Sequence, residues 1–221
     1  MKIYIIMLKI PFYKNTKDGL HCFQACLKSI LKFYFPKENY SFKYLDKVTA
    51  HKKGKGTWVS AALIFLAKKG FDIINIEIFD YKKFAKLGEK YLENLWTDEV
   101  FQEQKRFSNF KNEQKLAKKL ASKKKIKLKT RPATLQDIKL FFKKEYVLLC
   151  TINPQVLKKQ KGYYSHLVLI TDIKKDFIVF HDPGPPPLKN KKVSTKLFMK
   201  AMNYPSNRSA SLIAVKFSKT T

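Results

Sequence analysis

The feature that most limits the fold of this chain is a set of short apolar runs in its last third. Each run has the length of a β-strand, and residues typical of turns separate one run from the next. The runs occupy residues 146–153, 166–172, 177–181 and 211–217, with a helical pattern at 195–202 before the last of them. Because most other helical patterns come earlier in the chain, the sequence predicts an α+β fold with an antiparallel sheet.

Helical periodicity is clearest at residues 23–34. The apolar residues there return every three or four positions, which predicts a helix that starts at His21–Cys22 and stops before Pro36. The other predicted elements are helices at 59–67, after an N-cap at Thr57, and at 135–144, and strands at 2–12 and 71–79.

The middle of the chain, at 81–129, is polar and rich in Lys and Glu, with helical spacing and no strand character. It predicts two or three surface helices with a break near 108–112. The chain has 221 residues, and no repeat or linker rich in Pro and Gly divides it. We therefore expect residues 1–221 to form a single domain around one core.

The chain is strongly basic, with a formal net charge of +29. Such a charge raises the question of a nucleic-acid or anionic-membrane partner. Only three of its 46 cationic side chains are Arg, however, and Arg is the residue that recognises phosphates and base edges through paired hydrogen bonds. No specific nucleic acid is therefore expected. A basic nucleic-acid-binding module, supported by the charge and the Lys-rich run 123–129, is the alternative from another class.

Cysteine usage and hydropathy favour a cytoplasmic location. Three cysteines are too few for a disulfide scaffold, which suits a reducing compartment. Lys9 and Pro11 interrupt the apolar N-terminal segment, so we expect neither a secretory signal nor a membrane span. The sequence does not indicate an oligomeric state.

Cys22 is the first candidate for a chemical role, because it lies at the start of the helix predicted at 23–34. The unpaired N–H groups at a helix start lower the pKa of a thiol and favour the reactive thiolate. Cys26 lies on the apolar face of the same helix and Cys150 lies within an apolar run, so both are predicted to be buried packing residues. From position alone, Cys22 can also be a helix-start residue without a chemical role.

A hairpin near the end of the chain supplies a histidine and a carboxylate. If the hairpin is centred on Lys174, His166 lies directly opposite Asp182 on one face. In a Cys–His–Asp arrangement the His takes the proton of the thiol and the Asp orients the imidazole. Taken singly, His166 can be an ordinary strand-edge histidine and Asp182 an ordinary turn residue before Pro183.

Three segments share their order and spacing with a known family. They are His21–Cys22–Phe23–Gln24–Ala25–Cys26–Leu27, then His166–Leu167–Val168–Leu169–Ile170, and last His181–Asp182–Pro183–Gly184. In the last segment, Asp182 follows His166 by sixteen positions. They resemble the C39-like branch of the papain-like cysteine peptidases, whose members start a helix with Asp-Cys-Gly-x-Ala-Cys-Leu and later carry a His before an apolar strand and an Asn-Asp-Pro.

This resemblance implies a papain-like fold in which Cys22 is the nucleophile, His166 the general base and Asp182 the orienting carboxylate. The implied activity is cleavage of a peptide or amide bond in a peptide or protein substrate, through a thioester and without a cofactor. The resemblance covers nearly the whole chain, with the helical region at about 81–129 as an insertion. An acyltransferase and a catalytically inactive peptide-binding relative of the same fold are the alternatives.

Two positions depart from the family pattern. Phe23 stands where the family has a Gly after the nucleophile, which predicts crowding of an approaching substrate. No Gln precedes Cys22, and Asn15 is the nearest amide able to donate a hydrogen bond to an oxyanion.

No metal is expected from the spacing of the candidate ligands. Cys22 and Cys26 form a Cys-x₃-Cys pair without a second pair, which is not the pattern of a structural zinc site. His51 lies in a run rich in Lys and Gly that predicts an exposed loop, and this run lacks the strand, helix and Ser or Thr of a phosphate-binding loop.

Overall fold

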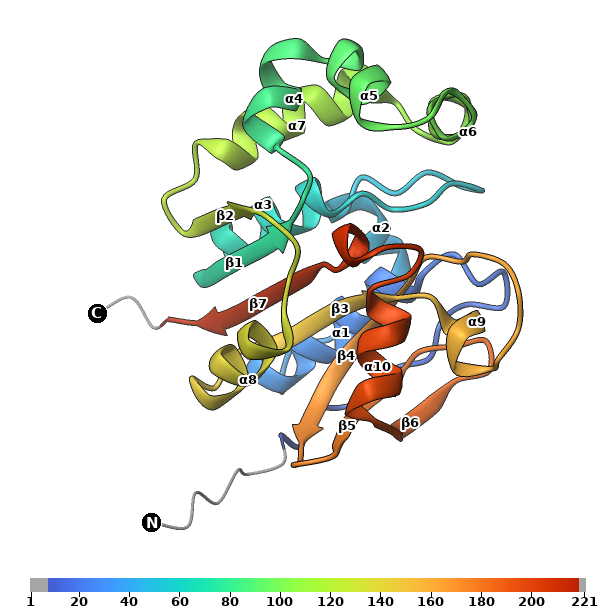
Figure 1. Ribbon diagram of the computed structural model, residues 1–221. Helices are drawn as coiled ribbons and strands as arrows, with labels where there is room; N and C mark the ends of the chain where they lie inside the picture. The colour runs from blue at the N-terminus through green and yellow to red at the C-terminus, as the bar shows by residue number, and fades with distance from the viewer. Residues whose placement is uncertain (1–7, 219–221) are drawn as a thin grey trace.

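A computed structural model describes residues 8–218 as a seven-stranded sheet with helices on both faces (Figure 1). The strand order is β2-β1-β7-β3-β4-β5-β6, and neighbouring strands are antiparallel except for the parallel pair β1–β2. The strands are β1 (Phe71–Glu77), β2 (Ile126–Thr130), β3 (Val147–Ile152), β4 (His166–Ile173), β5 (Phe177–Asp182), β6 (Leu188–Ser194) and β7 (Leu212–Phe217).

The helices form three groups around this sheet. Helices α1 and α3 lie on one face, α8 and α10 lie on the other, and α4 to α7 gather beyond the β1–β2 edge (Figure 1). The helices are α1 (Cys22–Tyr34), α2 (Phe42–Val48), α3 (Val59–Lys68), α4 (Tyr81–Leu87), α5 (Glu89–Leu95), α6 (Asp98–Phe107), α7 (Phe110–Ala121), α8 (Leu135–Lys143), α9 (Pro154–Leu157) and α10 (Thr195–Met202), with a 3₁₀ turn at Asn207–Ser209.

Two hydrophobic cores lie on the two faces of the sheet, and β4 contributes to both. Leu167 and Leu169 pack in the core on the α1 side, whereas Val168 and Ile170 pack in the core that contains Phe198 of α10. Because both faces of β4 are covered, the strand is buried along its whole length. This explains why its sequence is a continuous apolar run without the alternation of a half-exposed strand.

Most predicted elements are confirmed. Helix α1 begins at Cys22 and ends at Tyr34, as its periodicity and Pro36 predict, and the expected strands and helices of the last third are present. Helix α8 starts from a capping box in which the Thr134 hydroxyl accepts from the Asp137 N–H. The mixed α+β class follows directly from this arrangement.

Four local predictions are wrong or incomplete. The middle region at 81–129, predicted as two or three helices without a strand, forms helices α4 to α7 and then strand β2 at Ile126–Thr130, with Ile126 turned into the core and lysines on the exposed side. Thr57 does not cap α3, since Trp58 holds that position and the Thr57 hydroxyl bonds elsewhere. Helix α2 and strand β6 were not predicted. Of the strand expected at 2–12, residues 1–7 lie outside the described part and 8–12 form no strand.

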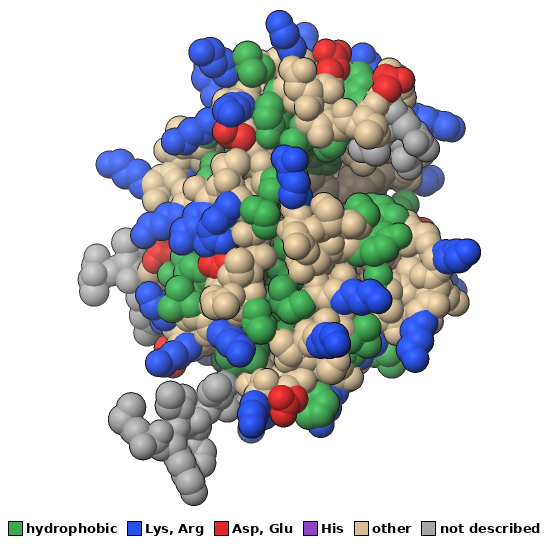
Figure 2. Space-filling model, in the orientation of Figure 1, with side chains coloured by type: hydrophobic (Ala, Val, Ile, Leu, Met, Phe, Trp, Pro, Cys, Tyr) green, Lys and Arg blue, Asp and Glu red, His purple; other side chains and the backbone are tan. Residues whose placement is uncertain are grey.

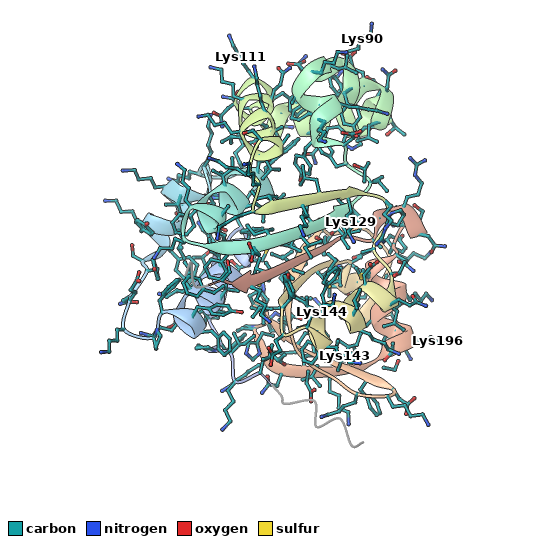
Figure 3. The ribbon with its side chains drawn as sticks, turned by 90° about the vertical axis from the view of Figure 1, so that its left-hand side faces the viewer. Lys90, Lys111, Lys129, Lys143, Lys144 and Lys196 are labelled. Carbon is teal, nitrogen blue, oxygen red and sulfur yellow. The ribbon has the colours of Figure 1, made fainter. Side chains whose placement is uncertain are left out.

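Lysine side chains are spread over the face of the molecule that Figure 2 shows. In the view of Figure 2 they are scattered among apolar and uncharged groups over the whole visible face. Figure 3 labels six of them, on α5, α7, β2, at the end of α8 and on α10. No helix within residues 8–218 combines the length and apolar character needed to cross a bilayer.

Candidate active site

Cys22 is the first residue of α1 and its side chain is partly exposed. The first helical hydrogen bond runs from the Ala25 N–H to the His21 carbonyl at 2.9 Å, so the N–H groups of Cys22 and Phe23 precede the helical ladder. One turn further on, the Cys26 thiol lies 3.7 Å from the Leu167 carbonyl, which fixes the start of α1 against the start of β4. Cys22 therefore faces the strand end that carries His166.

His166 and Asp182 are hydrogen-bonded and buried. Their Nε2 and Oδ1 atoms are 2.8 Å apart, and both side chains are almost completely shielded from solvent. The same carboxylate has two further donors, the Gly184 N–H at 3.1 Å on Oδ1 and the Lys191 ammonium at 3.0 Å on Oδ2. The carboxylate is thus held on both oxygen atoms, and His166 is held by the carboxylate.

The predicted hairpin register is wrong by two positions. Leu169 pairs with His181, and the register shifts once more between Ile170 and Asp172 because the strand bulges there. Continuing the Leu169 pairing places Asp182 opposite Val168, so His166 is its diagonal neighbour. Diagonal neighbours share a face of the sheet and lie within reach of long side chains, which is why the two residues still meet.

The imidazole of His166 also interacts with the thiol of Cys22. Its second ring nitrogen, Nδ1, is buried and has no oxygen or nitrogen partner, and the interaction of the ring with the Cys22 sulfur shifts the pKa of both groups. Burial alone raises the pKa of Cys22, but the hydrogen bond and charge of His166, together with the N–H groups of Leu167 and Phe23, lower it further than burial raises it. The net pKa of Cys22 lies below its ordinary value.

The pKa values of His166 and Asp182 are shifted in opposite directions. Burial lowers the pKa of His166, yet hydrogen bonds to Asp182 and Cys22 outweigh burial and raise it to about 9. Burial raises the pKa of Asp182, but the bond and charge of His166, followed by those of Lys191, lower it to about 2. Cys22, His166 and Asp182 therefore form a row in which the thiol and the carboxyl group have lowered pKa values and the imidazole has a raised one, and the three titrate as a coupled unit.

The other two cysteines are buried, as predicted. Cys26 and Cys150 are 2% and 0% exposed. Burial raises the pKa of Cys26 well above its ordinary range, and the nearby charges of Cys22 and Asp182 add to this effect. Burial likewise raises the pKa of Cys150. Neither thiol shares the environment of Cys22.

Asn15 joins the loop before the nucleophile to the segment after Asp182. Its side-chain amide donates to the Gly19 carbonyl at 2.9 Å and to the Gly184 carbonyl at 3.0 Å, and its Oδ1 accepts from the His21 N–H at 2.8 Å. Both amide hydrogens are therefore already used, whereas an oxyanion donor has to be free when substrate arrives. We assign Asn15 to the support of the site and not to the oxyanion, which revises the sequence-based interpretation.

Phe23 does not crowd the surface of the site. Its side chain is 4% exposed and packs in the core on the α1 side of the sheet. A helix places successive side chains about 100° apart, so the residue after a surface nucleophile can point inward. The substitution of the family's Gly leaves the Phe23 N–H in place, where it contacts the Cys22 sulfur.

Three contributors to the site were missed by sequence reasoning. Lys191 lies on the unpredicted strand β6 and nothing distinguishes it from the other lysines in the sequence. Tyr164 stacks on His166 with ring centroids 6.1 Å apart and covers it from solvent. Gly184 has φ of +79°, and a Cβ there would lie 2.2 Å from the Pro187 nitrogen, so only glycine fits the turn that aims its N–H at Asp182. An Asp-Pro-Gly sequence was the available signal for this turn.

We predict that Cys22 is the thiol that reacts first with iodoacetamide. Its rate of alkylation should rise with pH and reach a plateau below the pH expected for a free cysteine, because its pKa is lowered. Peptide mapping of the native protein over a pH series measures this. Faster modification of Cys26 or Cys150, or a rate that keeps rising up to the pKa of a free thiol, contradicts the prediction.

Comparison with known proteins shows the family to which the chain belongs. The model of the Peptidase_C39 like family matches residues 85–214, which is more than half of the chain and includes His166 and Asp182. The chain therefore belongs to the Peptidase_C39 like family. The matched segment begins after Cys22, so the nucleophile candidate lies outside it.

A solved structure similar to this chain is the peptidase domain of Streptococcus ComA, a bi-functional ABC transporter involved in a quorum sensing pathway. The two chains are 15% identical, and the alignment covers 92% of this chain and 96% of the other, with a TM-score of 0.47. No curated protein matches this sequence.

Proposed function

We propose that this chain is a cysteine peptidase that cleaves a peptide or amide bond through a thioester intermediate. The observation that carries the proposal is the position of His166, whose Nε2 is hydrogen-bonded to Asp182 at 2.8 Å while the ring also interacts with the Cys22 thiol and lowers its pKa. A buried imidazole between a thiol and a carboxylate is the arrangement that activates a sulfur nucleophile. Membership of the Peptidase_C39 like family supports the same reaction class.

In the proposed reaction, the Cys22 thiolate attacks the carbonyl carbon of the scissile bond. The tetrahedral intermediate collapses as His166 gives its proton to the leaving amine, and the acyl group remains on Cys22 as a thioester. Water then attacks the thioester while His166 takes a proton from it, and the acid product leaves. Asp182 stabilises the imidazolium at both stages and holds the ring in position.

In the proposed reaction, the backbone at the start of α1 stabilises the oxyanion of the intermediate. The N–H group of Cys22 precedes the first helical hydrogen bond and lies at the positive end of the helix dipole, whereas the Phe23 N–H already contacts the Cys22 sulfur. This assignment needs no side-chain amide, which agrees with the use of both Asn15 hydrogens elsewhere. Release of the thioester to an amine in place of water makes the same residues an acyltransferase.

Trapping the acyl-enzyme tests the proposal. A panel of peptide thioesters and activated esters, mixed with the protein and quenched in acid, is expected to leave an acyl group on the chain, with the modified peptide mapping to Cys22. The His166→Ala variant should accumulate little adduct because its thiol is not activated. Acylation at a lysine, or equal acylation of wild type and His166→Ala, contradicts the proposal.

A further inference from the structure

A second cluster of polar side chains lies beside the proposed active site and plays no part in the thioester chemistry. His21, Asp46 and His51 come from the residue before α1, from α2 and from the loop after α2. One ligand atom from each of them lies within 4.8 Å of the other two. The imidazole rings of His21 and His51 have centroids 4.5 Å apart. His51 is thus partly buried in a cluster, although the run 51–56 is a mostly exposed loop, as predicted.

The hydrogen bonds of His21 determine which of its ring nitrogens carries a hydrogen. The Thr16 hydroxyl has one proton, which it donates to the Asp18 carboxylate at 2.5 Å. Its oxygen therefore accepts from His21 Nδ1 at 2.6 Å, and Nδ1 is the nitrogen that carries a hydrogen. This leaves Nε2 with a lone pair directed away from Thr16, unless a second proton is bound there.

His51 is also bonded to a threonine hydroxyl through Nδ1, but this bond does not fix which ring nitrogen carries the hydrogen. Its Nδ1 lies 2.9 Å from the Thr57 hydroxyl, so Nε2 is the free nitrogen. Thr57 is itself held by the side-chain amide of Gln24, a fully buried residue of α1, at 3.0 Å. A hydroxyl or carbonyl partner on one imidazole nitrogen is the usual way in which proteins orient a histidine whose other nitrogen binds a metal.

Asp46 supplies an oxygen without a partner. Its Oδ1 atom is buried, makes no hydrogen bond, and lies 3.3 Å from His21 Nε2. A carboxylate oxygen and an unprotonated imidazole nitrogen are both acceptors, so at this distance they require something positive between them. A proton on Nε2 is one solution, and a metal ion that both atoms bind is the other.

We propose that His21, Asp46 and His51 form a binding site for a divalent transition metal of the Zn²⁺ type. Imidazole nitrogen and carboxylate oxygen are ligands that Zn²⁺ accepts, and three protein ligands leave at least one position open to water or another ligand. Three convergent ligand atoms favour the metal over a single proton. Two of them are on imidazole rings bonded to a threonine hydroxyl through Nδ1, and the third is a buried oxygen without a hydrogen bond.

The site would link three separate segments next to the nucleophile. His21 immediately precedes Cys22, and its own N–H is bonded to Asn15. Binding of a metal would therefore fix the start of α1 relative to α2 and the His51 loop, which stabilises the folded chain. The inference does not depend on peptidase activity, since none of the three ligands touches the reacting thiol in the scheme above.

Zn²⁺ titration of the metal-free protein by calorimetry tests the site. One Zn²⁺ per chain is expected for wild type, and dissociation constants at least about tenfold higher for His51→Ala and for Asp46→Asn, which removes a charge at constant shape. The melting temperature of wild type should rise on addition of Zn²⁺, and that of Asp46→Asn should not. Melting of each variant without metal shows whether it is folded.

The matched controls are Cys22→Ser and His166→Ala, which remove the thiol and a histidine of the neighbouring site. Both are expected to bind Zn²⁺ as wild type does, whatever their activity. Absence of stoichiometric binding in folded wild type would mean that a proton joins His21 to Asp46, and it overturns the proposal. Loss of binding in Cys22→Ser or His166→Ala, or full binding in Asp46→Asn, overturns it equally by placing the metal elsewhere.

Discussion

Replacing Cys22 by Ser is expected to lower kcat/KM for a cleaved substrate by at least about 10⁴-fold, the scale of loss seen when the nucleophile of a catalytic triad is removed. A serine hydroxyl stays protonated at neutral pH and is a weak nucleophile, and the substitution also removes the Cys22 sulfur whose interactions help to raise the pKa of His166. The thiol differs, because its interaction with His166 lowers its pKa and so favours the reactive thiolate. The measurement is steady-state hydrolysis of the best substrate from the acylation panel.

Cys150→Ala is the matched control for this variant. It removes a thiol that is fully buried in β3 and separate from the proposed chemistry, so its kcat/KM should stay near that of wild type while its melting temperature falls. Equal activity of Cys22→Ser and wild type would show that the substrate is cleaved by another group. Loss of activity in folded Cys150→Ala would show that the assay responds to stability and not to the nucleophile.

The parts of this fold that were predictable from sequence depend on local patterns. Helix α1 has a complete apolar period and a Pro after its end, so both its limits were predicted. The doubly covered strand β4 was recognisable as an uninterrupted apolar run. Cys22, His166 and Asp182 were singled out because each lies at the start or end of such an element.

The parts that were not predictable depend on contacts between distant segments. Strand β2 looks like a solvated Lys-rich run, and its strand conformation comes from parallel pairing with β1. The hairpin register is set by a bulge near Thr171, and no Gly or other turn residue at this position indicates the bulge in the sequence. Asp46 lies on the unpredicted helix α2, and only the folded chain brings it to His21 and His51.

Asn15 illustrates a third kind of limit. The sequence shows an amide at a plausible distance from the nucleophile, but it cannot show which hydrogen bonds that amide already makes. Its two hydrogens go to the carbonyls of Gly19 and Gly184, the second of them 169 positions away. Its contribution to the site is to hold two loops together, and that role is visible only when both loops are placed.

Asp182→Asn is the second variant with a large expected effect, a fall in kcat of about 10²- to 10⁴-fold with the fold retained. The carboxylate accepts from His166 and Gly184 on Oδ1 and from Lys191 on Oδ2. An amide has a single acceptor oxygen. If that oxygen faces His166, the NH₂ group meets the Lys191 ammonium; if the amide is flipped, NH₂ meets the N–H groups of His166 and Gly184. Either orientation places a donor against a donor and removes the charge that stabilises the imidazolium.

The pH profiles of activity and stability separate this role from that of a turn residue. With Asp182 present, the alkaline limb of kcat/KM should lie near pH 9, where His166 loses its proton, and the limb should move to lower pH in Asp182→Asn. The pKa of Asp182 is lowered to about 2, so its stabilising effect is present above its ordinary pKa and is lost as the pH falls towards 2. Thermal melting of wild type should show this acid-dependent loss more strongly than Asp182→Asn. If Asp182 served only the turn before Pro183 and Gly184, Asn would replace it with little change, and an unaltered alkaline limb with full activity would refute its role as the partner of His166.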